Sequence, residues 1–92
     1  MKKILLVEDD KALQKLIVYN FQKEGFNIET VNDGEEALYF IKENYPDLIL
    51  LDWMLPNMSG IEIARQLKLN KKSMFIPIIM LTAKSEEPDK LR

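Results

Sequence analysis

The chain has 92 residues, enough for one small domain, and its hydrophobic content of 47% is typical of a globular protein. Its 13 basic and 15 acidic residues leave a formal net charge of −2, so no basic excess favours nucleic acid or an anionic membrane. Cysteine and histidine are both absent, which excludes disulfides, thiolate metal sites and histidine-based catalysis. No apolar run has the length of a membrane span or the form of a signal peptide. We therefore expect a cytoplasmic protein without membrane contact, whose chemistry rests on carboxylates, hydroxyls, amines or a bound metal.

The first half of the chain predicts two strands and two helices. The continuous apolar run at 3–7 fits a strand that is buried on both faces. Apolar residues recur at helical spacing through 9–25, where Gly25 marks the end of the helix. An alternating pattern predicts an outer strand at 26–31, and helical spacing returns over 32–44. The apolar residues at helical spacing in the first helix are Leu13, Leu16, Ile17 and Phe21. The alternating strand has Phe26, Ile28 and Thr30 on one face, and the inner stripe of the second helix is Ala37, Leu38 and Ile41.

The second half continues the same alternation. The segment 47–52 is the most apolar strand and is predicted to be central. A helix follows over 59–70, with Ile61, Ala64 and Leu67 or Ile63 on its inner face. A further buried strand is predicted over 75–82, and 85–92 has the pattern of a helix that is just beginning. Residue pairs with the spacing of a capping box are Asp33 with Glu36 and Ser59 with Glu62.

This order of elements predicts an α/β fold with a parallel sheet and helices on both faces. In such sheets, ligands bind beyond the carboxyl ends of the strands, where the strand order reverses. If the first and third strands are neighbours, Glu8, Asp9 and Asp52 converge on one pocket, and Thr82 offers a hydroxyl nearby. Clustered carboxylates must either take up protons or hold a cation, and hard oxygen ligands suit Mg²⁺. An aspartate beside such a cation is a candidate phosphoryl acceptor.

Each of these residues also has a simpler interpretation. Asp9 or Asp10 can cap the first helix, and Glu8 and Thr82 can be ordinary polar residues at strand ends. Asp52 is harder to explain in this way, because it lies inside the apolar stretch "LILLDWMLP" and is too far from the helix at Ser59 to cap it. A carboxylate in such a stretch is costly unless something compensates its charge. The functional interpretation is therefore preferred for Asp52.

Four segments resemble the receiver domain of bacterial two-component response regulators: "ILLVEDD", "NDGEEAL", "PDLILLDWMLPNMSG" and "PIIMLTAKSEE". The resemblance extends over essentially the whole chain. Within that family, "LLDWMLP", "MLTA" and "EEPDKLR" look most like the phosphate-regulon type of the winged-helix transcription factors. The resemblance implies a flavodoxin-like, doubly wound parallel sheet, here truncated after the fourth strand, with the strand order 2-1-3-4.

The resemblance also implies a role for each site residue. Asp52 is similar to the phospho-accepting aspartate of the family, and Thr82 matches its switch hydroxyl. Glu8 and Asp9 match the acidic pair that organises Mg²⁺. In this scheme Asp9 and Asp52 bind the metal directly, and Glu8 acts mainly through a bound water. Met54 would contribute its backbone carbonyl.

The family's sheet has five strands and a final fifth helix, whereas this chain stops at Arg92. We therefore expect residues 1–92 to form a receiver domain whose fourth helix is cut and whose fifth strand, fifth helix and family lysine are absent. The expected partners are a sensor histidine kinase and a second copy of the chain, which would pair along the exposed fourth strand. DNA would be bound only through an output domain that this chain lacks.

The expected function is that of a signalling switch rather than an enzyme, with at most self-phosphorylation and autodephosphorylation. One alternative is a degenerate receiver that only mediates dimerisation. Another is a metal-dependent phosphatase with an aspartyl nucleophile. Such phosphatases generally have a second aspartate where Met54 stands here.

Overall fold

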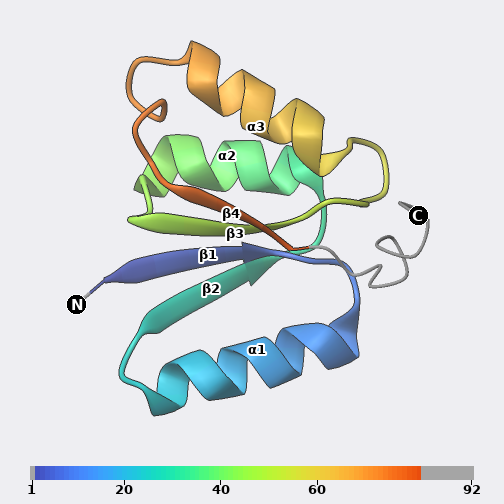
Figure 1. Cartoon of the computed structure of the whole chain (residues 1–92), viewed down its shortest axis with the longest axis vertical. Coiled ribbons are helices and arrows are strands. Elements are labelled where there is room, and N and C mark those ends of the chain that lie inside the picture. Colours follow the sequence, from blue (N-terminus) through green and yellow to red (C-terminus); the bar gives the residue numbers. More distant parts are fainter. Residues whose placement is uncertain (1, 82–92) are drawn as a thin grey trace, which may run out of the picture.

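The structure is a computed structural model that describes residues 2–81, and it consists of four strands and three helices in alternation (Figure 1). The strands are β1 (Lys3–Val7), β2 (Asn27–Val31), β3 (Leu48–Asp52) and β4 (Ile78–Leu81). The helices are α1 (Lys11–Lys23), α2 (Gly34–Asn44) and α3 (Gly60–Leu69). The helix predicted to begin at 85–92, and the predicted site residue Thr82, lie outside the described residues.

The four strands form one parallel sheet in the order β2-β1-β3-β4, as predicted. Helix α1 covers one face of the sheet, and α2 and α3 lie together on the other (Figure 1). The central strands β1 and β3 are in register, with Val7 opposite Leu51. Their carboxyl ends therefore open at the same edge of the sheet, where the order of the strands reverses. This confirms the predicted flavodoxin-like α/β fold.

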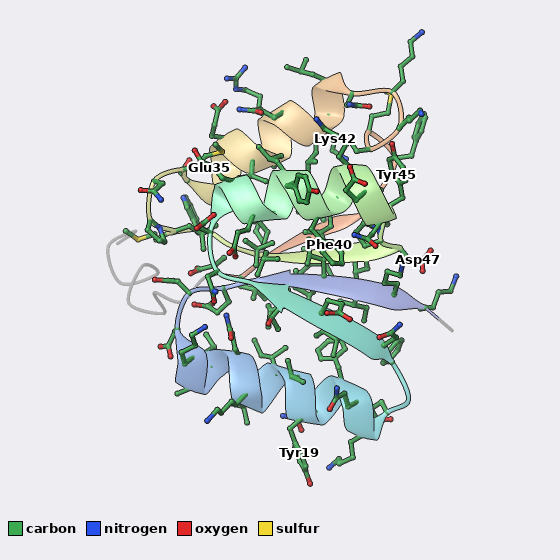
Figure 2. All side chains as sticks on the ribbon, turned by 180° about the vertical axis from the view of Figure 1, so that it is seen from behind. Tyr19, Glu35, Phe40, Lys42, Tyr45 and Asp47 are labelled. Carbon is green, nitrogen blue, oxygen red and sulfur yellow. The ribbon has the colours of Figure 1, made fainter. Side chains whose placement is uncertain are left out.

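Each face of the sheet has its own hydrophobic core. Leu5 and Val7 of β1 point towards α2 and α3, whereas Ile4 and Leu6 point towards α1. This explains the unbroken apolar run of β1, because both sets of alternating side chains are buried. Burial of one such side chain contributes about 1.5–3 kcal/mol. Figure 2 shows Phe40 directed from α2 towards the sheet and Tyr19 directed away from it.

Several predicted inward-facing residues are exposed instead. In α3, Ile61 is 53% exposed, whereas Ile63 and Leu67 are buried. Residues four apart lie on the same helix face, and Ile61 lies on the opposite side of α3 from that stripe. In α1, Leu16 is exposed and Gln14 is buried. In the predicted outer strand, Ile28 is buried, whereas Phe26 and Thr30, which the alternating pattern placed on the same face, are exposed.

The fourth strand begins at Ile78, not at residue 75 as predicted. The chain turns over residues 71–76, where the backbone N–H of Met74 donates to Asn70 and that of Ile76 donates to Ser73. These local bonds take the N–H groups away from the sheet, and Pro77 has none to offer. Phe75, predicted to be in the strand, is consequently exposed.

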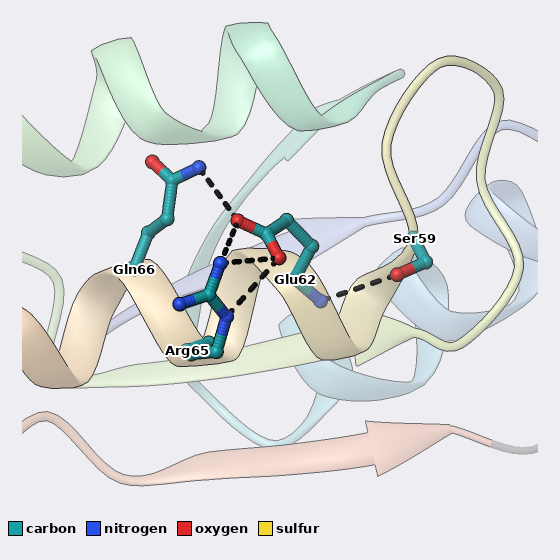
Figure 3. Close-up of polar contacts among 4 residues, drawn as sticks. All are labelled: Ser59, Glu62, Arg65 and Gln66. Atoms are coloured by element: carbon teal, nitrogen blue, oxygen red, sulfur yellow. Dashed lines mark hydrogen bonds and ion pairs between the residues drawn. The ribbon is translucent and has the colours of Figure 1, made fainter.

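Polar side chains cap the amino ends of all three helices. Asp10 caps α1 by accepting from the backbone N–H groups of Ala12 and Leu13. Ser59 caps α3 by accepting from the N–H of Glu62, but the Glu62 carboxylate binds Arg65 and Gln66 (Figure 3). A cap of this kind contributes about 1 kcal/mol. The remaining cap is Asp33, which accepts from the N–H of Glu36 at the start of α2.

Candidate metal and phosphoryl site

Three carboxylates meet at the carboxyl ends of the two central strands. Glu8 and Asp9 directly follow β1, and Asp52 is the last residue of β3. One carboxylate oxygen from each of the three lies within 4.8 Å of the others. The adjacency of β1 and β3 brings these acids together across more than forty residues of sequence. The predicted convergence of Glu8, Asp9 and Asp52 is confirmed.

Two of the three acids are buried. Glu8 is 3% exposed and Asp52 is 4% exposed, whereas Asp9 is exposed. The Oε2 atom of Glu8 accepts a hydrogen bond from the backbone N–H of Asp10 at 3.0 Å. Its Oε1 atom is buried and has no hydrogen-bond partner among the described residues. A buried carboxylate oxygen without a partner is unfavourable unless a proton or a cation occupies the site.

The electrostatics of the cluster also favour a proton or a cation in the site. Burial raises the pKa of Glu8 above its ordinary value of 4.5, and the negative charges of Asp52 and Asp9 raise it further. Burial also raises the pKa of Asp52, although the hydrogen bond from the Met54 N–H partly offsets that rise. A bound cation would reverse both effects, because it favours the ionised carboxylates. The set of hard, clustered oxygen atoms fits a divalent cation such as Mg²⁺.

The loop after β3 lies directly against the end of that strand. The N–H of Met54 donates to Asp52 Oδ1 at 3.3 Å, which orients the carboxylate. At the far end of the loop, the N–H of Gly60 donates to the carbonyl of Trp53 at 2.8 Å. A Cβ atom at Gly60 would overlap the carbonyl oxygen of Asp52. Glycine is therefore required at this position for α3 to begin so close to the acid.

Sequence reasoning missed one buried polar residue beside the cluster. Gln14, in α1, is 8% exposed, and its amide contacts the backbone of Glu8. The pattern held a signal for it, because Gln14, Ile17 and Phe21 have the i, i+3, i+7 spacing of one helix face. The apolar Leu13 and Leu16 were assigned to that face instead.

A parallel sheet of this order, with three acids at the ends of its central strands, defines a receiver domain. The family model described as the response regulator receiver domain matches residues 4–92, and the chain belongs to that family. The phosphate regulon transcriptional regulatory protein PhoB of Rhizobium meliloti is 47% identical over 92 residues, which are all of this chain and 40% of that protein. The alkaline phosphatase synthesis regulatory protein PhoP of Bacillus subtilis is 48% identical over 90 residues, which are 98% of this chain and 37% of that protein. These relatives confirm the predicted resemblance to the phosphate-regulon type, and the chain spans two fifths of their length or less.

Solved receiver domains share the fold. The receiver domain of the sensor histidine kinase PA1611 from Pseudomonas aeruginosa superposes with a TM-score of 0.88 at 31% identity. The similarity covers 99% of this chain and 75% of that one. The structure of that relative has a magnesium ion coordinated in its active site cleft.

Proposed function

We propose that this receiver domain is a phosphorylation-dependent switch in which Asp52 accepts a phosphoryl group from a phosphohistidine of a sensor histidine kinase. The observation that carries the proposal is the cluster of Glu8, Asp9 and Asp52 with the unpartnered, buried Oε1 of Glu8. The magnesium ion in the cleft of the related PA1611 receiver domain supports Mg²⁺ as the cation.

The proposed metal ligands are the carboxylates of Asp9 and Asp52 and the backbone carbonyl of Met54, with Glu8 acting through a water. When bound, Mg²⁺ supplies positive charge that offsets the charge on the phosphoryl oxygens. The buried position of Asp52 excludes bulk water from much of its carboxylate. The Met54 N–H holds one oxygen of that carboxylate and so fixes the direction of the group.

In the proposed transfer, a carboxylate oxygen of Asp52 attacks the phosphorus of the phosphohistidine. The phosphorus–nitrogen bond breaks, its electron pair stays on the imidazole, and an acyl phosphate forms on Asp52. Thr82 is proposed as the hydroxyl that then binds a phosphoryl oxygen and reports the new state. The net result is a group transfer to the protein itself, so the domain is a switch rather than a turnover enzyme.

The remaining parts of the proposal concern domains, partners and location. We propose that residues 1–92 belong to the receiver domain of a PhoB-like regulator, in which an output domain would bind DNA. Homodimerisation and a cytoplasmic location are proposed with it. The identity to PhoB and PhoP along the whole chain supports this assignment. Among the described residues, no helix has both the length and the hydrophobicity needed to cross a membrane.

The test is incubation with a small acyl phosphate donor and Mg²⁺, followed by the intact mass of the protein. The parent is expected to gain the mass of one phosphoryl group, and the Asp52→Asn variant none. A matched control is Asp47→Asn, which changes an exposed aspartate just before the other end of the same strand (Figure 2). Asp47→Asn should be labelled like the parent, and removal of Mg²⁺ with a chelator should abolish labelling in both. A parent that is never labelled would favour the degenerate, dimerisation-only receiver.

A further inference from the structure

The amide of Gln14 connects three elements beside the acidic cluster. The first turn of α1 lies next to the carboxyl ends of β1 and β2 (Figure 1). From there, Gln14 Nε2 donates both to the backbone carbonyl of Glu8 and to the side-chain Oδ1 of Asn32, the latter at 2.9 Å. Because both partners are acceptors, the orientation of the amide is determined by its hydrogen bonds.

The hydrogen bonds of Gln14 to Glu8 and to Asn32 form a bridge, and Asn32 anchors its outer end. Its Oδ1 also accepts from Lys11 Nζ at 2.8 Å, and its backbone N–H donates to Glu36 Oε1 at 2.8 Å. The hydrogen bonds therefore run from the end of β1, through α1, to the first turn of α2. Such a connected set fixes the positions of its members better than separate bonds would.

The bridge acts on the peptide that joins two of the three acids. The carbonyl of Glu8 belongs to the Glu8–Asp9 peptide group, so a hydrogen bond to that oxygen fixes the orientation of the peptide plane to which Asp9 is attached. The N–H of Glu8 is held as well, because it donates to the carbonyl of Val31 at 3.1 Å. Glu8 is thus fixed on both sides, and Asp9 takes its direction from the peptide that Gln14 holds.

We propose that Gln14 is a positioning residue for the metal site, setting the direction of Asp9 relative to Asp52 through the Glu8 carbonyl. This inference rests on the proposed function, because it concerns the Mg²⁺ site of that function. Groups that orient metal ligands from outside the coordination sphere typically change metal affinity by roughly 10- to 100-fold when they are removed. A glutamine that served only to satisfy a buried carbonyl would change stability but not affinity.

The test is the Mg²⁺ dissociation constant of the metal-free chain, measured by the fluorescence of Trp53, which directly follows Asp52. Gln14→Met keeps the length and shape of the side chain but removes both donated hydrogen bonds. We expect it to weaken Mg²⁺ binding roughly 10-fold or more. Gln22→Met makes the same change at an exposed position of the same helix and should leave the dissociation constant unchanged.

Two further variants distinguish a positioning role of Gln14 from a general loss of stability. Ile17→Ala removes packing between α1 and the sheet without touching Glu8, and it should lower the melting temperature while leaving Mg²⁺ affinity close to that of the parent. Asn32→Ala removes the outer anchor at an exposed position, so it tests the bridge even if Gln14→Met does not fold. We expect Asn32→Ala to weaken Mg²⁺ binding by a smaller factor than Gln14→Met.

Unchanged Mg²⁺ affinity in both Gln14→Met and Asn32→Ala, with a parent that binds Mg²⁺, would overturn this inference and leave the proposed function intact. Equal losses of affinity in Gln14→Met and Ile17→Ala would also overturn it, because they would show a purely structural role. A parent that does not bind Mg²⁺ at all would refute the proposed metal site, and this inference with it.

Discussion

The contact between Gly60 and the end of β3 yields a quantitative prediction. In Gly60→Ala, the new Cβ atom would overlap the carbonyl oxygen of Asp52 and would lie 3.1 Å from the Cα atom of Trp53. These are backbone atoms of a central strand and its exit, so no side-chain rotation can relieve the contact. Either the start of α3 or the Asp52–Trp53 peptide must move.

The expected cost follows from two opposing terms. Overpacking of this kind costs about 1–3 kcal/mol. Replacing glycine by alanine in a helix returns up to about 1 kcal/mol, and less in the first turn. We therefore expect the free energy of unfolding to fall by about 1–2 kcal/mol. For a domain of this size that corresponds to a decrease in melting temperature of roughly 5–15 °C. Mg²⁺ binding should weaken too, because the peptide that follows Asp52 is displaced.

Thermal unfolding followed by circular dichroism, together with the Trp53 fluorescence titration, measures both effects. Gly25→Ala is the matched control, because Gly25 has a φ of +93° and nothing within 4 Å of a Cβ atom. That change should cost about 1 kcal/mol through backbone conformation alone. It should leave Mg²⁺ affinity unchanged. A Gly60→Ala variant with the melting temperature and Mg²⁺ affinity of the parent would refute the reasoning.

Three further predictions concern other parts of the domain. Without metal, the pKa of Asp52 is raised in the folded protein, so the stability that its protonated form contributes is fully present below its ordinary pKa of 3.8 and is lost as the pH rises towards the higher folded-state value. At neutral pH, Asp52→Asn should therefore have a larger free energy of unfolding in urea than the parent, and a less stable variant would contradict this. Tyr45 ends α2 with a φ of 45°, so Tyr45→Gly should raise the free energy of unfolding by about 0.5–1 kcal/mol, whereas Tyr39→Gly inside the same helix should lower it by about 1 kcal/mol. If urea unfolding shows that both variants change the free energy in the same direction, the left-handed conformation assigned to Tyr45 would be refuted. Ile79 is 51% exposed on β4, and within the described sheet this strand pairs only with β3. Ile79→Lys should therefore reduce self-association of the chain in sedimentation, and a parent that is monomeric at high concentration would exclude pairing through this strand.

Much of the fold could be predicted because periodicity and burial agree in this chain. The apolar runs of β1 and β3 have alternating side chains that fill two different cores, and this is the arrangement a continuous apolar run predicts. The Asp–Glu and Ser–Glu spacings located the starts of α2 and α3. The pairing of β1 with β3 followed from the strand order implied by the family resemblance, and it brought Glu8, Asp9 and Asp52 together as expected.

The errors came from features that depend on tertiary contacts. Hydrophobicity alone placed Leu16 and Ile61 inside, although a buried amide in α1 and the close approach of α3 to β3 set the faces of those helices. The early start assigned to β4 came from reading Phe75 as a core residue, whereas local hydrogen bonds turn the chain there. The role of Gln14 could not be seen in the sequence, because its partners are a backbone carbonyl and a side chain eighteen positions away.

The central claim is that Asp52 is the residue that becomes phosphorylated, and locating the modification tests it most directly. An acyl phosphate is reduced by borohydride to an alcohol, so treatment of the phosphorylated chain followed by peptide mass spectrometry marks the modified residue. The proposed function predicts the mark on Asp52 alone, dependent on Mg²⁺ and lost when the acyl phosphate is first hydrolysed with base. A mark on Asp9 or Glu8, or stable phosphate on a hydroxyl such as Ser59, would contradict it.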